Sequence, residues 1–94
     1  MTYLIVRHKV EDYDTWKAVY DEHAVSRKAL GSQGARVLKN VDDPSEQLII
    51  TEWPSLEHAR RFAASPDLRE AMQRAGIIGM PEVVFLEEVD RQSA

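Results

Sequence analysis

The spacing of apolar residues switches repeatedly between the period of a strand and that of a helix, and the order of these switches constrains the fold most. Apolar residues that alternate with polar ones predict strands, and apolar residues three and four positions apart predict helices. Strands are predicted over 2–10, 35–41, 47–53 and 82–89, and helices over 13–30, 56–64 and 66–75. The order is therefore β-α-β-β-α-β, with the second helix broken near Ser65.

Residues that favour caps and turns separate these elements. Asp12 or Asp14 can cap the first helix, because a carboxylate accepts hydrogen bonds from the free N–H groups of a first turn. The cluster 42–45 (Asp-Asp-Pro-Ser) predicts a turn that makes the second and third strands an antiparallel hairpin. Ser65 stands before a proline at a first helical position and starts a new helical segment. The apolar stretch 77–81 is predicted to be a loop.

This order of elements is the split βαβ, or ferredoxin-like, pattern, an α+β fold with a four-stranded antiparallel sheet. Helices that connect these strands lie on one side of the sheet, so the other face has no cover within the chain. We expect that face to carry part of the set Ile5, Val37, Ile49 and Phe85, or their neighbours of opposite parity. A second copy of the sheet is the simplest cover, which predicts a homodimer packed sheet to sheet.

Composition excludes several classes of protein. The 94 residues suffice for a single domain with one core, in which residues 90–94 form a frayed tail. No apolar run reaches the ~18 residues of a membrane span, and no signal peptide is evident, so we expect a cytoplasmic protein without a membrane partner. The absence of cysteine excludes disulfides and thiolate metal sites. A net charge of −4 with scattered basic residues argues against nucleic-acid binding.

His8 is the first candidate catalytic residue. It shares the inner face of the first strand with Leu4 and Val6, beside the helix that begins at Tyr13. A neutral imidazole can take a proton from a phenol or an acidic C–H near neutral pH, so His8 is a candidate general base. The alternative is a structural histidine bonded to a backbone carbonyl or to Asp12.

Aromatic residues concentrate on one stripe of the first helix. Tyr13, Trp16 and Tyr20 recur at spacings of three and four. Flat rings suit the walls of a site for an aromatic ligand. These three residues, together with Trp53 and Phe62, are therefore predicted to bind a small aromatic molecule. Ordinary core packing is the alternative for each of them.

The other two histidines are further candidates. His23 follows Tyr20 by three positions and is either a second pocket histidine, auxiliary to His8, or half exposed. His58 lies in the first turn of the second helix, either at the mouth of a pocket or in solvent. No local cluster of metal ligands surrounds them, so no metal is predicted.

Several short runs of the sequence are similar to one known family. They are 6–16 (VRHKVEDYDTW), 42–44 (DDP), 52–53 (EW), 59–62 (ARRF) and 65–70 (SPDLRE). Together they resemble small dimeric α+β barrel proteins, often labelled antibiotic-biosynthesis-monooxygenase-like, over roughly residues 2 to 89. The resemblance implies a dimer with one pocket per subunit, between the sheet and the helices.

The resemblance implies a range of activities rather than one. The superfamily includes cofactor-independent quinone-forming monooxygenases, haem-degrading enzymes, polyketide cyclases, isomerases and members with no known activity, and the fold does not choose among them. The haem-degrading members use an asparagine on the first strand, whereas this chain has His8 as the polar residue of that strand, so haem degradation is not expected.

These features predict a small homodimeric enzyme that acts on a planar phenolic or polyketide-like molecule. His8 would be the base, and the resulting phenolate or carbanion would react with oxygen directly, as in a cofactor-independent monooxygenase, or would cyclise or isomerise. No cofactor is expected. The alternatives are a dimer that binds an aromatic metabolite without changing it, and a structural protein with a filled core.

Overall fold

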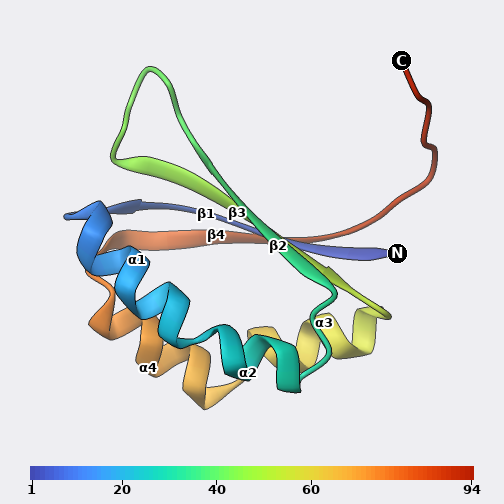
Figure 1. Ribbon diagram of the computed structural model, residues 1–94, viewed down its shortest axis with the longest axis horizontal. Helices are drawn as coiled ribbons and strands as arrows, with labels where there is room; N and C mark the ends of the chain where they lie inside the picture. The colour runs from blue at the N-terminus through green and yellow to red at the C-terminus, as the bar shows by residue number, and fades with distance from the viewer.

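Two strand–helix–strand units follow each other along the chain, and a computed structural model describes all 94 residues. Figure 1 shows the strands in one layer and the helices in a second layer on one side of it. The strands are β1 (Thr2–Val10), β2 (Gly34–Lys39), β3 (Glu46–Trp53) and β4 (Ile77–Glu87). The helices are α1 (Tyr13–Glu22), α2 (Ala24–Ala29), α3 (Leu56–Ala63) and α4 (Pro66–Arg74). The predicted ferredoxin-like α+β fold is confirmed.

The inner strands of the antiparallel sheet are β1 and β3, and the strand order is β2-β3-β1-β4. Val6 of β1 pairs with Ile49 of β3 on one side and with Val83 of β4 on the other. The pairing of β2 with β3 confirms the predicted antiparallel hairpin. Because β1 is central, the polar residue His8 is held inside the sheet rather than at its edge.

The core lies between the helices and the face of the sheet that they cover. It consists of two clusters of buried side chains, and each cluster joins strand residues to helix residues. The first cluster comprises Leu4, Trp53, Ala59 and Phe62, and the second comprises Val10, Trp16, Ile49 and Ala75.

The opposite face of the sheet has no helix over it (Figure 1). Ile5 lies at its centre, paired with Ile50 of β3 and with Val84 of β4. The apolar set expected on this face is thus divided between the two faces. Directly paired residues share a face, which places the other three members with Leu4 on the helix side: Val37, Ile49 and Phe85.

Side-chain caps begin three of the four helices. Asp12, not Asp14, caps α1, and its carboxylate accepts a hydrogen bond from Thr15 N at 3.0 Å. Ser55 caps α3, and Ser65 caps α4, so the predicted break near Ser65 is confirmed. No helix is both long and apolar enough to cross a membrane.

The single helix predicted over 13–30 is two helices that meet at His23. His23 has ψ −3°, far from the ~−42° of a regular helix. The chain bends there while His23 N–H still donates to Val19 O, and Arg27 N–H to His23 O. The prediction was wrong because no glycine or proline marks the bend.

The apolar stretch 77–81 is the first part of β4 and not a loop. Ile77 pairs with Val10, and the register of the two strands shifts between Arg7 and Lys9. Gly79 has φ +73°, a conformation that favours glycine and is typical of a bulge. The prediction was wrong because a glycine between apolar residues marks a strand bulge as well as a loop.

Two strands also end earlier than predicted. β2 ends at Lys39 rather than at residue 41, which leaves Val41 in the hairpin loop and 89% exposed. β4 ends at Glu87 rather than at residue 89, and Val89 is 94% exposed. Each of these valines continues a strand-like pattern, but no neighbouring strand extends far enough to pair with it.

Candidate functional site

An apolar cavity lies between the covered face of the sheet and the helices. Of its 15 lining residues, 11 are hydrophobic, and the polar ones are His8, His23, Arg27 and Thr51. The space between its walls that no atom fills, open solvent at the mouth included, is about 560 Å³. The centres of water-sized molecules can occupy about 70 Å³ of it, several times the ~10–15 Å³ that one water needs. The core is therefore not completely filled by its own side chains.

His8 lies on β1 at the sheet side of this cavity, and only 6% of it is exposed. Its Nε2 is 3.0 Å from Nε2 of Gln47, its paired residue on β3. Its Nδ1 is buried and has no hydrogen-bond partner in the protein. Burial lowers the pKa of His8 to about 4, so the ring is neutral at pH 7. The partner that holds His8 is thus Gln47 rather than a backbone carbonyl or Asp12.

A row of flat groups extends from His8 along the cavity wall. Trp16 meets His8 edge-on, with ring centroids 5.7 Å apart, and Tyr20 stacks on Trp16 at 4.7 Å. The guanidinium carbon of Arg27 lies 3.9 Å from the centre of the Tyr20 ring, at cation–π distance. All four side chains line the cavity. Two aromatic rings therefore stand between a neutral imidazole and a cation.

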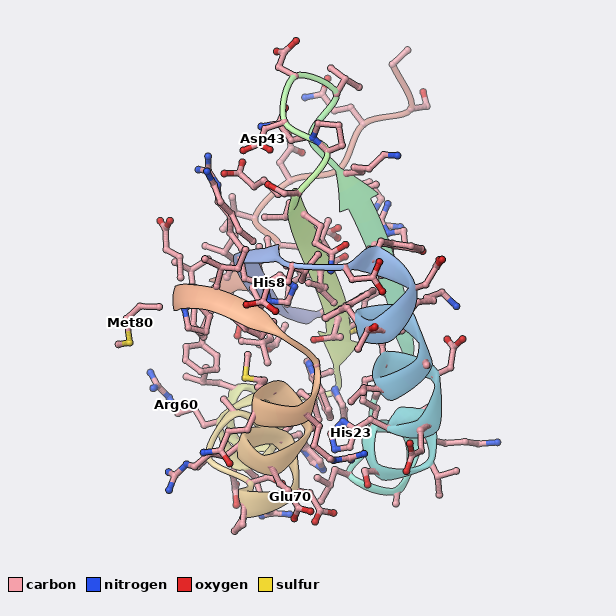
Figure 2. All side chains as sticks on the ribbon, turned by 90° about the vertical axis from the view of Figure 1, so that its left-hand side faces the viewer. His8, His23, Asp43, Arg60, Glu70 and Met80 are labelled. Atoms are coloured by element: carbon pink, nitrogen blue, oxygen red, sulfur yellow. The ribbon has the colours of Figure 1, made fainter.

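His23 also lines the cavity, from the bend between α1 and α2. Figure 2 shows His8 at the level of the sheet and His23 between the two pairs of helices. The Nε2 atom of His23 is buried without a hydrogen-bond partner, and its ring lies 5.8 Å from that of Phe62. Burial, and secondly the charge of Arg27, lower the pKa of His23. The ring also borders a polar surface groove, so it forms part of the wall between cavity and groove.

Of the five aromatic residues predicted to form ligand-binding walls, the structure brings three to the cavity: Trp16, Tyr20 and Phe62. Tyr13 does not line it and is 44% exposed, because it begins α1 beyond the end of the cavity wall. Trp53 does not line it either. It is completely buried behind Phe62, with ring centroids 4.8 Å apart, and its indole N–H donates to a threonine hydroxyl of the same strand. Trp53 therefore supports the wall and is not part of its surface.

His58 lies outside the cavity, at the start of α3. It is half-buried, and its Nδ1 is 2.7 Å from Oγ of Ser55. No group of three or more histidine, aspartate or glutamate side chains in the protein could hold a metal ion.

The sequence patterns did not identify Arg27 and Gln47 as site residues. Arg27 falls on the same helical stripe as Tyr20, and a charged residue within an apolar stripe is the signal that points to it. Gln47 shares the inner-face parity of Ile49, so it is a polar residue at an inward position. Its contact with His8 depends on the register of β1 and β3, which the sequence alone does not define.

The comparison with protein families gives a match over most of the chain. Residues 6–74 match the model of the antibiotic biosynthesis monooxygenases. The matched span runs from β1 to α4 and includes His8, Trp16, Tyr20, His23 and Arg27. None of the curated proteins matches this sequence.

Solved structures of the same fold cover almost the whole chain. SnoaB, a cofactor-independent oxygenase from Streptomyces nogalater, superposes with a TM-score of 0.81 at 14% identity, over 99% of this chain and 97% of its own. Rv0793 from Mycobacterium tuberculosis superposes with a TM-score of 0.75 at 15% identity, over 98% of each chain. At such identities the similarity shows the fold alone. Since the family model covers most of the sequence and the fold agrees throughout, the chain belongs to the antibiotic biosynthesis monooxygenase family.

Proposed function

We propose that this protein is a small homodimeric enzyme that acts on a planar phenolic or polyketide-like molecule, as a cofactor-independent monooxygenase or as a cyclase. One observation carries the proposal: the buried, neutral His8 forms part of an aromatic cavity wall and leaves Nδ1 without a protein partner. Buried polar atoms are nearly always hydrogen-bonded, so a ligand atom is the natural partner for Nδ1. The family to which the chain belongs supports an oxygenase chemistry.

The proposed reaction begins with proton transfer from the substrate to His8. Loss of a proton from a phenol or an activated C–H leaves an electron pair on the substrate, and the phenolate or carbanion reacts with dioxygen directly. When a methylene group becomes a carbonyl, one oxygen atom enters the product and the other leaves as water with the two hydrogens, so no further reductant is needed. In a cyclase, the same carbanion would attack a carbonyl carbon of the substrate.

The pKa of His8 restricts the substrates that it can deprotonate. With a pKa of about 4, His8 is a weak base. Proton transfer from an ordinary phenol, with a pKa of ~10, would be uphill by about 8 kcal/mol. A substrate whose phenol or C–H is acidified by a neighbouring carbonyl group reduces this difference. Carbonyl-rich, polyketide-like molecules therefore fit His8 better than simple phenols.

Gln47 determines which role His8 can take. A neutral imidazole has one N–H and one accepting nitrogen. When the amide nitrogen of Gln47 donates to His8 Nε2, as in the observed arrangement, Nδ1 carries the hydrogen and can only donate to a ligand. When the amide turns so that its oxygen faces Nε2, Nδ1 becomes the accepting atom and His8 can act as a base. The observed arrangement favours a second candidate function, a dimer that binds the aromatic molecule without changing it.

The proposed homodimer would use the open face of the sheet. Ile5, Ile50 and Val84 form an apolar row across three strands there, and Leu48 lies beside this row on β3. An apolar face of this kind on a sheet needs a covering layer. A second copy supplies one by the same row of residues, as a two-fold interface requires.

Thermal-shift measurements with product analysis, under air and under nitrogen, test the proposed function. The panel contains hydroxylated polycyclic aromatics, carbonyl-bearing phenols and simple phenols. We expect a carbonyl-bearing phenol to raise the melting temperature and to be consumed under air. His8→Gln should lower its turnover by at least about 100-fold, whereas the control variant His58→Gln, outside the cavity, should keep full turnover.

The outcomes separate the candidates. Full turnover by His8→Gln would contradict a catalytic role of His8. Consumption without oxygen would support the cyclase. A shift in melting temperature without consumption of any compound would support the binding dimer.

A further inference from the structure

Arg27 is a buried cation without a counterion. Only 9% of it is exposed, and it forms no salt bridge. Asp21 is the carboxylate whose charge acts on it, and Asp21 is already paired with Lys17 Nζ at 2.6 Å. Buried charges are normally paired, because removing an ion from water without compensation is costly. Arg27 is therefore a largely buried residue at a cavity wall whose guanidinium forms no salt bridge within the protein.

A structural role accounts for only part of this side chain. One nitrogen, Nη1, donates to the carbonyl oxygen of Tyr20 in the last turn of α1, at 3.0 Å, and the guanidinium lies over the Tyr20 ring. That bond caps a carbonyl that the helix leaves free. A guanidinium has five N–H donors. Arg27 forms no other hydrogen bond within the protein, and its remaining nitrogens reach solvent. Hydrogen-bonding capacity thus remains at a residue that lines the cavity.

We propose that Arg27 binds the carboxylate of a planar aromatic acid, so that the cavity takes hydroxylated aryl carboxylates rather than neutral aromatics. This inference rests on the proposed function and specifies its substrate class. The fork of a guanidinium matches the two oxygens of a carboxylate. The unpartnered Nε2 of His23, one helical turn before Arg27, can donate a further hydrogen bond to the same anion in its Nε2–H tautomer.

The wall between Arg27 and His8 gives the shape of this ligand. Trp16 and Tyr20 are stacked between the two polar residues, with centroids 4.7 Å apart. A flat ligand that lies along these rings would place its acid group at Arg27 and a phenolic or carbonyl group at the opposite end, at His8. The cavity would thereby fix the orientation of the bound ligand.

Binding of a matched acid and amide tests this proposal. The probes are 6-hydroxy-2-naphthoate and 6-hydroxy-2-naphthamide, which have the same rings and hydroxyl group but differ in charge. Affinity is measured by calorimetry and by quenching of tryptophan fluorescence. We expect the wild-type protein to bind the acid about tenfold or more tightly than the amide, as hydrogen bonds to a charged partner imply.

Variants then assign the preference to Arg27. Arg27→Gln should lower the affinity for the acid to that for the amide and leave the amide nearly unaffected, and Arg27→Lys should keep part of the preference. Arg60→Gln is the matched control. Arg60 also lies over an aromatic ring, 4.8 Å from the centre of Phe85, but it is exposed and outside the cavity, so its loss should preserve the preference.

Equal affinity of the wild-type protein for both probes would overturn the inference and leave the proposed function intact. Equal weakening of both probes by Arg27→Gln would also overturn it, because that result is expected if Arg27 only caps α1. If neither probe bound, while a neutral polycyclic phenol did, the aryl-acid class would be wrong. If no aromatic compound bound, both the inference and the proposed function would fail.

Discussion

At the scale of single residues, the hydrogen bond between His8 and Gln47 decides the chemistry of the cavity. The two side chains face each other across β1 and β3, with their nitrogens 3.0 Å apart. The hydrogen on the imidazole sits on Nδ1 when the Gln47 amide donates, and on Nε2 when the amide accepts. Imidazole ¹⁵N shifts distinguish these tautomers. We expect the Nδ1–H form in the free protein, and the Nε2–H form in a substrate complex in which Nδ1 of His8 is ready to accept a proton.

Gln47→Glu should raise the pKa of His8. A carboxylate next to Nε2 favours the charged imidazolium and opposes the effect of burial, which now holds the pKa at about 4. An NMR titration of the His8 ring measures the change. Gln73→Glu makes the same substitution on the exposed side of α4 and should leave the titration unaltered. An unchanged His8 pKa in Gln47→Glu would contradict the contact.

The low pKa of His8 also predicts how stability depends on pH. The unfolded chain protonates this histidine below a pKa of ~6.5, whereas the folded protein leaves it neutral down to a pKa of about 4. Between these values the unfolded state binds an extra proton, so the free energy of unfolding decreases as the pH falls, by about 3 kcal/mol in total. Below a pH of about 4 both states bind the proton, so His8 lowers the free energy of unfolding no further.

Urea unfolding of the wild type and of His8→Gln, at intervals between about pH 7.5 and 4, isolates this contribution. The variant should show a shallower loss of stability as the solution is acidified. His23, whose pKa is also lowered, should add a smaller effect of the same sign in both proteins. Parallel stability curves for the two proteins would show that His8 is not neutral in the folded state.

At the scale of elements, the N-terminal caps hold the helices over the cavity. Asp12 accepts hydrogen bonds from both the backbone N and the hydroxyl of Thr15, at 3.0 and 2.7 Å. Asp12→Ala should lower the free energy of unfolding by about 1 kcal/mol. Asp14→Ala is the matched control, since Asp14 lies in the same first turn but does not cap it. Denaturant unfolding compares the two variants, and an equal loss in both would contradict the assigned cap.

The elements also show where a local pattern stops being informative. The spacing of apolar residues predicted α1 and α2 as one helix, because the apolar stripe continues past His23 and helical hydrogen bonds reach His23 from both sides. It predicted a loop at 77–81, because Gly79 does not reveal whether a neighbouring strand continues alongside. Both errors concern geometry that depends on contacts distant in the sequence.

At the scale of the whole molecule, one face of the sheet is covered by helices and the other is not (Figure 1). Val84, on the edge strand β4, is 41% exposed within the apolar row of the open face. Val84→Lys should convert the proposed dimer into monomers, because the two-fold interface would bury both introduced charges. Light scattering coupled to size-exclusion chromatography measures the mass.

A matched variant shows whether the effect is specific to that face. Val25→Lys introduces the same change on α2, where Val25 is 77% exposed on the helix side of the molecule. It should leave the dimer unchanged. A wild-type protein that is monomeric at micromolar concentration would contradict the sheet-to-sheet dimer directly.

The sequence by itself determined the order of the elements, the antiparallel hairpin and the inward position of His8. These features follow from interactions between residues close in the chain: the alternation along β1, the turn at 42–45, and the caps at Asp12 and Ser65. They hold in any fold that buries the apolar stripes, because the periods of a strand and a helix are local properties of the backbone.

Only the tertiary structure decided which side chains surround the cavity. It moved Tyr13 to the surface and Trp53 behind the wall, and it brought Arg27 and Gln47 to the site. Each of these placements depends on the register between strands and on the bend at His23, and so on contacts between residues far apart in the chain. A sequence pattern gives the face on which a residue lies, but the packing of the helices on the sheet decides what that face meets.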